Sequence, residues 1–394
     1  MKIIIVGSSA YFNASGGKVL RYITNNLMSN GHEVEIVIFG NPREDSNDFF
    51  HKNFNISYLG NRGAGYNRFN HILKYSKLQR FEEILISAKP DLVHFAPFDY
   101  SISRYAIETA IKTKNRVILE PWTYNFFCHQ MFAYREGNAC SLCVETGYYQ
   151  SIKMHCATAC NIHSIISRKL IQSSALKANG FLSSNSFLDE VLLKYGVEPT
   201  KIFRFPIPYE IKDSTTICGE NEEDYFIFYG QFKDFKGIEV LTDIFSNLPG
   251  INLRIYPIGP YSQFKKISTN IKIYNDVTWG SGLDAAIKNA KAVVLPTLWP
   301  TTTEYALYEA MNNYKAIVAF NIGAHKEILI NGYNALVARV GNINEFTDAI
   351  LLLNKDKELR TKLGQNAFVS LKKLTSPDII YKMLMDIYKK VNEI

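Results

Sequence analysis

The sequence predicts an α/β fold made of two doubly wound, Rossmann-like domains. Three features support this: a length of 394 residues, two successive series of apolar runs alternating with amphipathic stretches, and a polar, proline-containing segment between the series. A chain of this length exceeds one ordinary core, and strand–helix–strand crossovers produce parallel sheets. We expect the two domains to face each other across a cleft at the carboxyl ends of their strands, where open α/β sheets bind ligands.

The first series starts at the beginning of the chain. Its short apolar runs predict strands over residues 2–6, 34–39, 56–59, 92–95 and 117–119. A helix is expected over 18–30, because Val19, Ile23 and Leu27 share one face and Gly31 suits a left-handed C-cap. The opening apolar run is too short for the hydrophobic region of a signal peptide, so it is interpreted as the first strand.

The second series begins at Tyr225. Apolar runs predict strands within 225–230, 252–259, 270–274 and 292–295, and helices are expected over 237–247, 283–289 and 304–311. The polar, acidic stretch 206–224 has the composition of a linker. We therefore expect an N-terminal acceptor-binding domain over 1–206 with a cysteine-rich insertion at 121–163, a C-terminal nucleotide-sugar-binding domain over 207–375, and a helix over 376–394 that packs back on the N-terminal domain.

Composition excludes several classes of protein. With 47% hydrophobic and 21% charged residues, the chain is neither disordered nor fibrous. No apolar stretch reaches the roughly 18 residues of a membrane span, so a cytoplasmic protein is expected.

A net charge of +7 fits an ordinary solvated surface or attraction to anionic groups, and no nucleic-acid-binding module is recognised. The basic, amphipathic segment 62–80 is either a solvated surface helix or a peripheral contact with an anionic membrane.

Three segments suit phosphate chemistry. Gly16 and Gly17, at an expected helix start, would let the backbone approach a phosphate, although their loop lacks the spacing of a dinucleotide fingerprint or a P-loop. Lys236 stands at the start of a helix after a buried strand, where a cation can neutralise a diphosphate; Lys233 is its competitor. In PTLWPTTTEYALYEAM, from Pro296, a strand, a proline-threonine loop and a glutamate-bearing helix follow one another without a gap.

These pieces, in their order along the chain, resemble glycosyltransferase family 4 of the two-Rossmann (GT-B) architecture. The matching pieces are the GG-helix-GHEV start, KPDLVHF, YGQFKDFKGIEVL, IYPIG, AVVLPTLWP, E-A-M and AHKEILINGYNALV. The resemblance implies a retaining transferase that binds a nucleoside diphosphate sugar in the C-terminal domain and needs no catalytic metal. Lys236 matches the cation that stabilises the departing diphosphate, and Glu309 matches the glutamate that binds the ribose hydroxyls.

The sequence departs from the family pattern at three positions. Thr301 stands where the first of two paired glutamates is expected, Glu304 is the nearest carboxylate, Gln231 replaces a phosphate-binding arginine, and Trp122 replaces an acceptor-side histidine. The expected catalytic residues are therefore Lys236, Glu304 and Glu309. The remaining candidates are donor-binding Gly16, Gly17, Gly230, Gln231, Thr302 and Thr303, and acceptor-side Trp122 and His94.

Five of six cysteines fall between Cys128 and Cys160. The spacing C-x2-C-x12-C-x3-C, formed by Cys140, Cys143, Cys156 and Cys160, suits a structural zinc. Cys128 is an alternative ligand, and so are His129, His155 and His163. Some family 4 transferases for surface polysaccharides have a similar pattern, which matches Cys128, Cys140, Cys143 and Cys156. Free buried thiols and an iron–sulfur cluster are the other interpretations of the insertion, which we expect to shape the acceptor site.

The expected function is transfer of a hexose-type sugar from a nucleoside diphosphate sugar to a saccharide or glycolipid, in the biosynthesis of a surface polysaccharide such as capsule or O-antigen. The alternative is a sugar-nucleotide-binding protein without turnover that regulates an active transferase. Other two-Rossmann chemistry, such as phosphorolysis or epimerisation, is a third interpretation. The sequence leaves the base, the sugar and the acceptor open.

Overall fold

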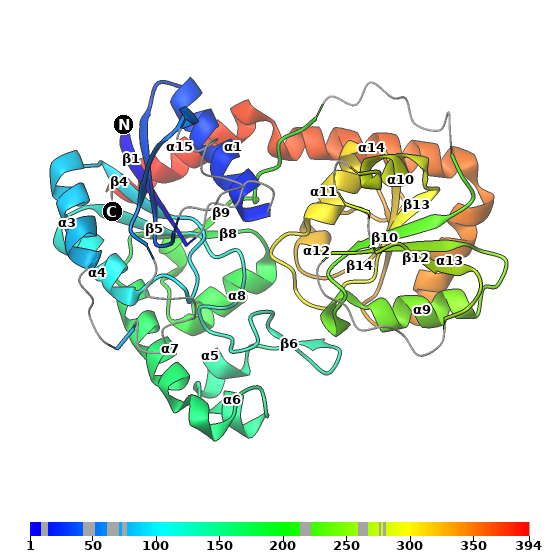
Figure 1. The fold of residues 1–394 in the computed structure, drawn as a ribbon, viewed down its shortest axis with the longest axis horizontal. Coiled ribbons are helices and arrows are strands. Elements are labelled where there is room, and N and C mark those ends of the chain that lie inside the picture. Colours follow the sequence, from blue (N-terminus) through cyan, green and yellow to red (C-terminus); the bar gives the residue numbers. More distant parts are fainter. Residues whose placement is uncertain are drawn as a thin grey trace. The chain divides into compact units, whose positions relative to one another are not determined.

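The structure is a computed structural model that describes residues 1–8, 15–41, 52–60, 71–72, 77–212, 222–258, 267–275, 277–278 and 281–393 (Figure 1). It divides into two compact units. Unit 1 consists of Met1–Ala133, Cys140–Glu210 and Pro377–Ile394, and unit 2 consists of Tyr134–Ala139 and Ile211–Ser376. Each unit has its own parallel sheet with helices on it, so each is described by itself.

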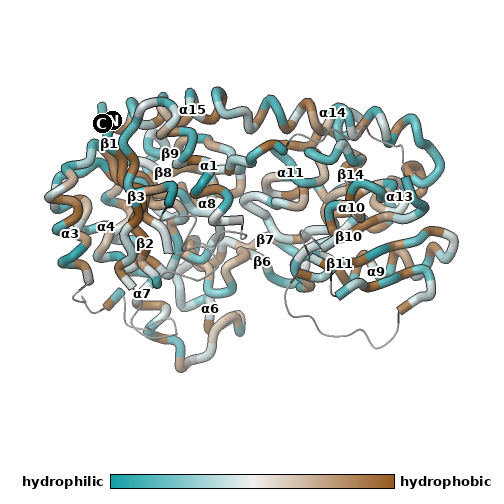
Figure 2. Tube along the Cα trace, turned by 45° about the horizontal axis from the view of Figure 1, so that its top comes forward, coloured by the Kyte–Doolittle hydropathy of each residue, from teal (hydrophilic) through white to brown (hydrophobic). Residues whose placement is uncertain are grey.

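The sheet of unit 1 is entirely parallel, in the order β3-β2-β1-β4-β5-β8-β9. Its strands are β1 (Lys2–Gly7), β2 (Glu33–Ile38), β3 (Asn55–Tyr58), β4 (Leu92–Phe95), β5 (Arg116–Leu119), β8 (Gly180–Ser183) and β9 (Ile202–Arg204). The central strands are continuous apolar runs, as expected where helices cover both faces of a sheet. Figure 2 shows β1 as a mainly hydrophobic segment.

The helices of unit 1 connect these strands. They are α1 (Ser15–Ser29), α3 (Lys77–Ala88), α4 (Arg104–Lys112), α5 (Leu142–Thr146), α6 (Gln150–Lys153), η1 (Ala159–Asn161), α7 (Ile162–Ala175), α8 (Ser186–Tyr195) and η2 (Pro199–Lys201). The chain ends with α15 (Pro377–Glu393), which contacts α1 and β5. The side chain of Asn26 in α1 donates a hydrogen bond to the Pro377 carbonyl over 2.8 Å, so the start of α15 is tied to this unit.

The sheet of unit 2 is also parallel, in the order β12-β11-β10-β13-β14-β15. Its strands are β10 (Phe226–Gly230), β11 (Leu253–Pro257), β12 (Ile271–Ile273), β13 (Ala292–Leu295), β14 (Ala316–Phe320) and β15 (Leu336–Ala338). A small antiparallel hairpin, β6 (Tyr134–Arg135) with β7 (Asn138–Ala139), also belongs to this unit. The order places β10, β13 and β14 side by side in the sheet.

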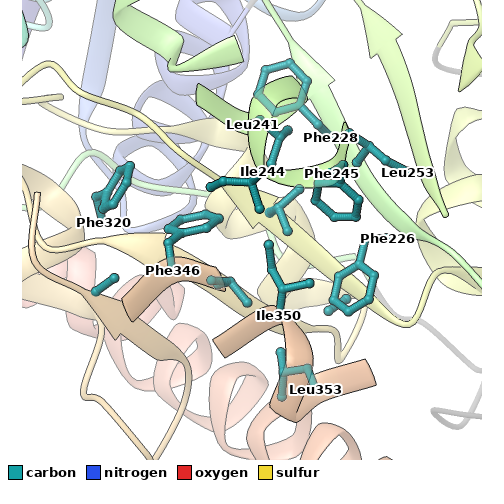
Figure 3. Close-up of a cluster of buried hydrophobic side chains, with 14 of the residues drawn as sticks. Phe226, Phe228, Leu241, Ile244, Phe245, Leu253, Phe320, Phe346, Ile350 and Leu353 are labelled. Carbon is teal, nitrogen blue, oxygen red and sulfur yellow. The ribbon is translucent and has the colours of Figure 1, made fainter. Parts of the chain in front are cut away.

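The helices of unit 2 are η3 (Asp234–Lys236), α9 (Ile238–Ser246), α10 (Leu283–Asn289), α11 (Tyr305–Asn312), α12 (Ala324–Ile328), α13 (Ile343–Lys355) and α14 (Lys357–Thr375). Side chains of α9 and α13 meet strands β10, β11 and β14 in one core cluster, drawn in Figure 3. Helix α11 packs on the opposite face of the sheet, where the Tyr229 hydroxyl of β10 donates to the Ala306 carbonyl over 2.8 Å. Helices therefore cover both faces of this sheet.

The α/β class and the two parallel sheets agree with the sequence-based prediction. The first helix starts at Ser15 rather than 18, and Gly31 after it has φ +81°, as a left-handed turn residue. Most of the basic segment 62–80 lies outside the described residues, so the hypothesis that it contacts a membrane stays a prediction. In the described part of the chain, no helix has the length and apolar character needed to cross a bilayer.

Candidate active site

Three neighbouring strands of unit 2 bring the candidate catalytic residues together. Lys236 ends η3, which follows β10; Glu304 immediately precedes α11, which follows β13; and His325 lies in α12, which follows β14. Because the carboxyl ends of adjacent parallel strands lie at one edge of a sheet, the three loops converge there. Residues separated widely in sequence thus meet at the place where an open α/β sheet binds its ligand.

Lys236 and Glu304 form a nearly buried ion pair. The Lys236 Nζ lies 2.5 Å from Glu304 Oε1, and their side chains are 13% and 6% exposed. Burial alone would raise the pKa of the Glu304 carboxyl, but the charges and hydrogen bonds of Lys236 and His325 outweigh it and hold that pKa well below its usual range. Glu304 is therefore an anion at neutral pH.

The second carboxylate oxygen of Glu304 has two further neighbours. His325 Nε2 lies 2.9 Å from Glu304 Oε2, and the Thr297 hydroxyl donates to the same oxygen over 2.8 Å. The other ring nitrogen of His325, Nδ1, lies 3.2 Å from the Phe320 carbonyl oxygen. Both ring nitrogens of the buried His325 therefore face oxygen atoms. The cluster brings the Lys236 ammonium, the His325 ring and the Thr297 hydroxyl to one carboxylate.

Backbone packing fixes the loops that carry these residues. Gly237 has φ +70°, and a Cβ there would lie 2.0 Å from the Pro296 carbonyl oxygen. Gly323, in the loop after β14, has φ +53° and packs against the loop after β13. A Cβ on Gly323 would lie 2.4 Å from the Thr301 nitrogen. The amide of Leu298 donates to the Phe235 carbonyl over 2.9 Å. The loops after β10, β13 and β14 thus touch backbone to backbone, which places their side chains before any ligand arrives.

The donor-side candidates of the C-terminal half lie in the same unit. Glu309 is buried in α11 with 7% exposure, and Thr302 is buried with 1% exposure. Gly230 ends β10 with φ +153°, and Gln231 after it is exposed. Thr303 is half-buried, and its carbonyl accepts a hydrogen bond from the Thr301 hydroxyl over 2.6 Å. That bond commits Thr301, which replaces the expected first glutamate, to the shape of its own loop.

Sequence reasoning missed His325. The segment AHKEILINGYNALV entered only as part of the family pattern, and no role was given to its histidine. The side chain is fully buried, and its proximity to Glu304 depends on β14 pairing with β13. The sequence did contain a signal: His325 directly follows a Gly-Ala pair, and that pair comes shortly after an apolar run. A loop in this position lies at the same sheet edge as Lys236 and Glu304.

Two candidates of unit 1 pack against each other. A Cβ on Gly16 would lie 3.1 Å from Cζ3 of Trp122, so the absence of a side chain at Gly16 makes room for the indole ring. Gly17 follows it in α1. The start of the first helix and the acceptor-side tryptophan therefore share one location.

His94 lies elsewhere in unit 1. Its ring is fully buried, with Nδ1 2.9 Å from the Tyr388 hydroxyl in α15 and Nε2 3.1 Å from a Glu120 carboxylate oxygen. A ring with 0% exposure and these two neighbours holds α15 on the sheet and presents no surface to an acceptor.

The cysteines of the insertion separate into a cluster and an outlier. Burial, followed by the charges of Cys128, Cys140 and Cys156, raises the pKa of the Cys143 thiol to about 12. Cys160 is exposed and is not among these neighbours. No three His, Cys, Asp or Glu side chains within the described ranges are grouped so as to hold a metal ion. The zinc site therefore stays a prediction, and its choice between Cys128 and Cys160 stays open.

Comparison with families of known proteins finds a match within the second unit. Residues 216–369 match the family described as Glycosyl transferases group 1. This part of the chain is similar to that family over most of the second unit. The predicted enzyme class, a glycosyltransferase, is thereby confirmed. Membership of family 4 and the retaining mechanism stay predictions.

Relatives and solved structures agree with this. The uncharacterized glycosyltransferase MJ1178 of Methanocaldococcus jannaschii is 24% identical over 314 residues, which is 75% of this chain and 83% of that protein. The structure of Anabaena HepE in complex with UDP-glucose covers 100% of both chains with a TM-score of 0.68 at 12% identity. The lipopolysaccharide outer core galactosyltransferase WaaB covers 98% of this chain and 99% of its own with a TM-score of 0.65 at 16% identity. The glycosyltransferase thus has the GT-B fold.

Proposed function

We propose that this glycosyltransferase transfers a hexose-type sugar from a nucleoside diphosphate sugar, with retention, to a saccharide or glycolipid acceptor. The observation that carries the proposal is the cluster of Lys236, Glu304 and His325 at the carboxyl edge of the unit 2 sheet. The Lys236 ammonium in this cluster is largely shielded from water and suits the diphosphate of a sugar donor.

Lys236 is the group that would act on the leaving diphosphate. As the bond between the sugar and the diphosphate breaks, negative charge grows on the phosphate oxygens, and an ammonium fixed nearby stabilises that charge without reorganisation. Lys236 has little freedom to move, because Nζ is paired and lies 5.8 Å from the centre of the Trp299 ring. Glu309, in the helix after the loop, would bind the ribose, and Gly230, Gln231, Thr302 and Thr303 would line the donor.

Similar proteins support a nucleotide-sugar donor and a surface-polysaccharide role. HepE was solved with UDP-glucose, and WaaB is described as acting on the lipopolysaccharide outer core. In unit 1, Gly16 and Gly17 would contribute to donor binding, and Trp122 would contribute to the acceptor side. No catalytic metal is part of this proposal, because the cation needed at the diphosphate is supplied by Lys236.

The test is a screen of the purified chain against UDP, GDP and ADP sugars, followed by thermal shift and by release of free sugar. Stabilisation by one nucleotide, with slow sugar release that is lost in Lys236→Ala and Glu309→Ala, is the expected result. Lys233→Ala is the matched control, since Lys233 is an exposed lysine of the same loop. Binding without release, with saccharide and glycolipid acceptors also supplied, would instead favour a sugar-nucleotide-binding regulator. No binding would overturn the proposal.

A further inference from the structure

A carboxylate occupies the position that an anionic ligand would need. Glu304 Oε1 lies 2.5 Å from Lys236 Nζ, the atom that would face the donor diphosphate. Phosphate and carboxylate oxygens cannot share one ammonium closely without mutual repulsion, which is strong where water is largely excluded. A diphosphate that binds Lys236 must therefore repel or replace Glu304.

The structure also contains the other partners that Glu304 would need. His325 Nε2 lies 2.9 Å from the other carboxylate oxygen, Oε2, and the Thr297 hydroxyl donates to that same oxygen. Glu304 is thus held from both sides, by Lys236 at Oε1 and by His325 and Thr297 at Oε2. If Oε1 gave up Lys236, the carboxylate would keep the His325 ring and a hydrogen-bond donor, so it would not be left buried without partners.

We propose that Glu304 is an exchangeable counter-ion: it neutralises Lys236 in the empty site and is retained by His325 and Thr297 when a diphosphate takes Lys236. This inference rests on the proposed function and adds to it a regulation of donor binding. Glu304 lowers the affinity of the empty site for diphosphate and recaptures Lys236 when the product leaves. His325 is a positioning residue, because it acts on Lys236 only through Glu304.

Two substitutions separate these roles. Glu304→Gln keeps the size of the side chain and removes its charge, so nucleoside diphosphate should bind about tenfold more tightly, the effect expected when a close charge of the wrong sign is removed. The shorter side chain in His325→Asn keeps a polar atom near the Phe320 carbonyl, where Nδ1 lies in the wild type. It lacks an atom at the position of Nε2, which faces Glu304. Glu304 then loses the ring that holds it at Oε2, so it stays closer to Lys236 and diphosphate binding should weaken about fivefold. His325→Gln, which reaches Glu304 again, should restore part of the affinity.

The experiment measures the affinity of UDP, GDP and ADP for the full chain and its variants by calorimetry, with thermal shift alongside. Glu327→Gln, an exposed charge removal in the same helix as His325, is the matched control and should bind like the wild type. In the double variant Glu304→Gln, His325→Asn, the effect of the histidine should vanish, because the group through which it acts is gone. A merely structural histidine would lower affinity in both backgrounds.

Each outcome of this experiment supports or overturns the counter-ion role of Glu304. Glu304→Gln should be less heat-stable when empty but gain more stability from the nucleotide than the wild type does. Equal affinity of wild type and Glu304→Gln would overturn the counter-ion role and leave the proposed function intact. Weaker binding by Glu304→Gln would also overturn it and would make Glu304 a direct ligand contact. Failure of all three nucleotides to bind any variant would overturn the proposed function and this inference with it.

Discussion

Gly237 packs its backbone directly against Pro296: a Cβ on Gly237 would lie 2.0 Å from the Pro296 carbonyl oxygen, and φ at Gly237 is +70°. This contact joins the loop that carries Lys236 to the loop that leads to Glu304. The positions of both charged side chains therefore depend on a residue that has no side chain and no chemistry of its own.

Substitution Gly237→Ala should separate the two loops. The added methyl group meets a carbonyl that cannot move cheaply, and the left-handed backbone adds strain, so we expect a loss of about 2–4 kcal/mol in the free energy of unfolding and loss of nucleotide binding. Denaturant unfolding measures the first and thermal shift with nucleotide the second. Gly250→Ala is the control, because nothing lies within 4 Å of a Cβ there. Equal behaviour of the two variants would contradict the role of this contact.

Removal of Lys236 should affect stability and catalysis in separable ways. Lys236→Met leaves the buried Glu304 charge without its main partner, which typically costs about 3–5 kcal/mol of stability. The double variant Lys236→Met, Glu304→Gln should regain most of that stability, because the unpaired charge is also removed. Sugar release should stay reduced by about 10²–10³-fold in both, the scale of losing one stabilising group for a developing anion. Unfolding midpoints and initial rates check the two effects, and recovery of activity in the double variant would rule out a catalytic cation at Lys236.

The Glu304 carboxyl predicts an acid-dependent loss of stability. Its pKa is depressed in the folded chain from the ordinary value of 4.5, so the folded state binds a proton less readily than the unfolded state does. The carboxylate contributes its full stability above that ordinary value, and the contribution falls as the pH is lowered beneath it. Urea midpoints measured from acid to neutral pH should decline less steeply for Glu304→Gln than for the wild type. Glu327→Gln should keep the wild-type slope, and identical slopes for all three proteins would contradict the prediction.

The insertion cysteines predict a structural zinc bound by Cys128, Cys140, Cys143 and Cys156. Elemental analysis of the purified chain should find about one zinc per chain, the content of a four-thiolate structural site. Cys143→Ser should lose the metal and unfold at a lower temperature. Cys160→Ser should keep both properties, because Cys160 is exposed whereas the other four thiols of the insertion are partly buried. Metal-free protein with all thiols open to titration after unfolding would show that these are free buried cysteines.

Local pattern predicted many of the strands and several of the helices, but not β8, β9, β14 or β15. The run before Gly7 and the run 292–295 are apolar over their whole length, which is typical of strands covered on both faces, and both are strands. Lys236 could be selected as a candidate cation because it combines a charge with a helix start after such a strand. Glu304 was selected for being the nearest carboxylate to a missing one, and its side chain proves to be buried between two basic groups.

Amino-acid sequence by itself determined the α/β class, the two series of strands and helices, and the chemical types available at each loop, because apolar periodicity and residue chemistry act over short distances. The pairing of Glu304 with Lys236 and His325 was decided by tertiary structure alone. It requires β13 to lie between β10 and β14, and this order depends on hydrogen bonding and packing across the whole sheet of unit 2. The greater exposure of Cys160 than of the other four insertion cysteines was likewise decided by the path of the chain in space, which spacing along the sequence does not specify.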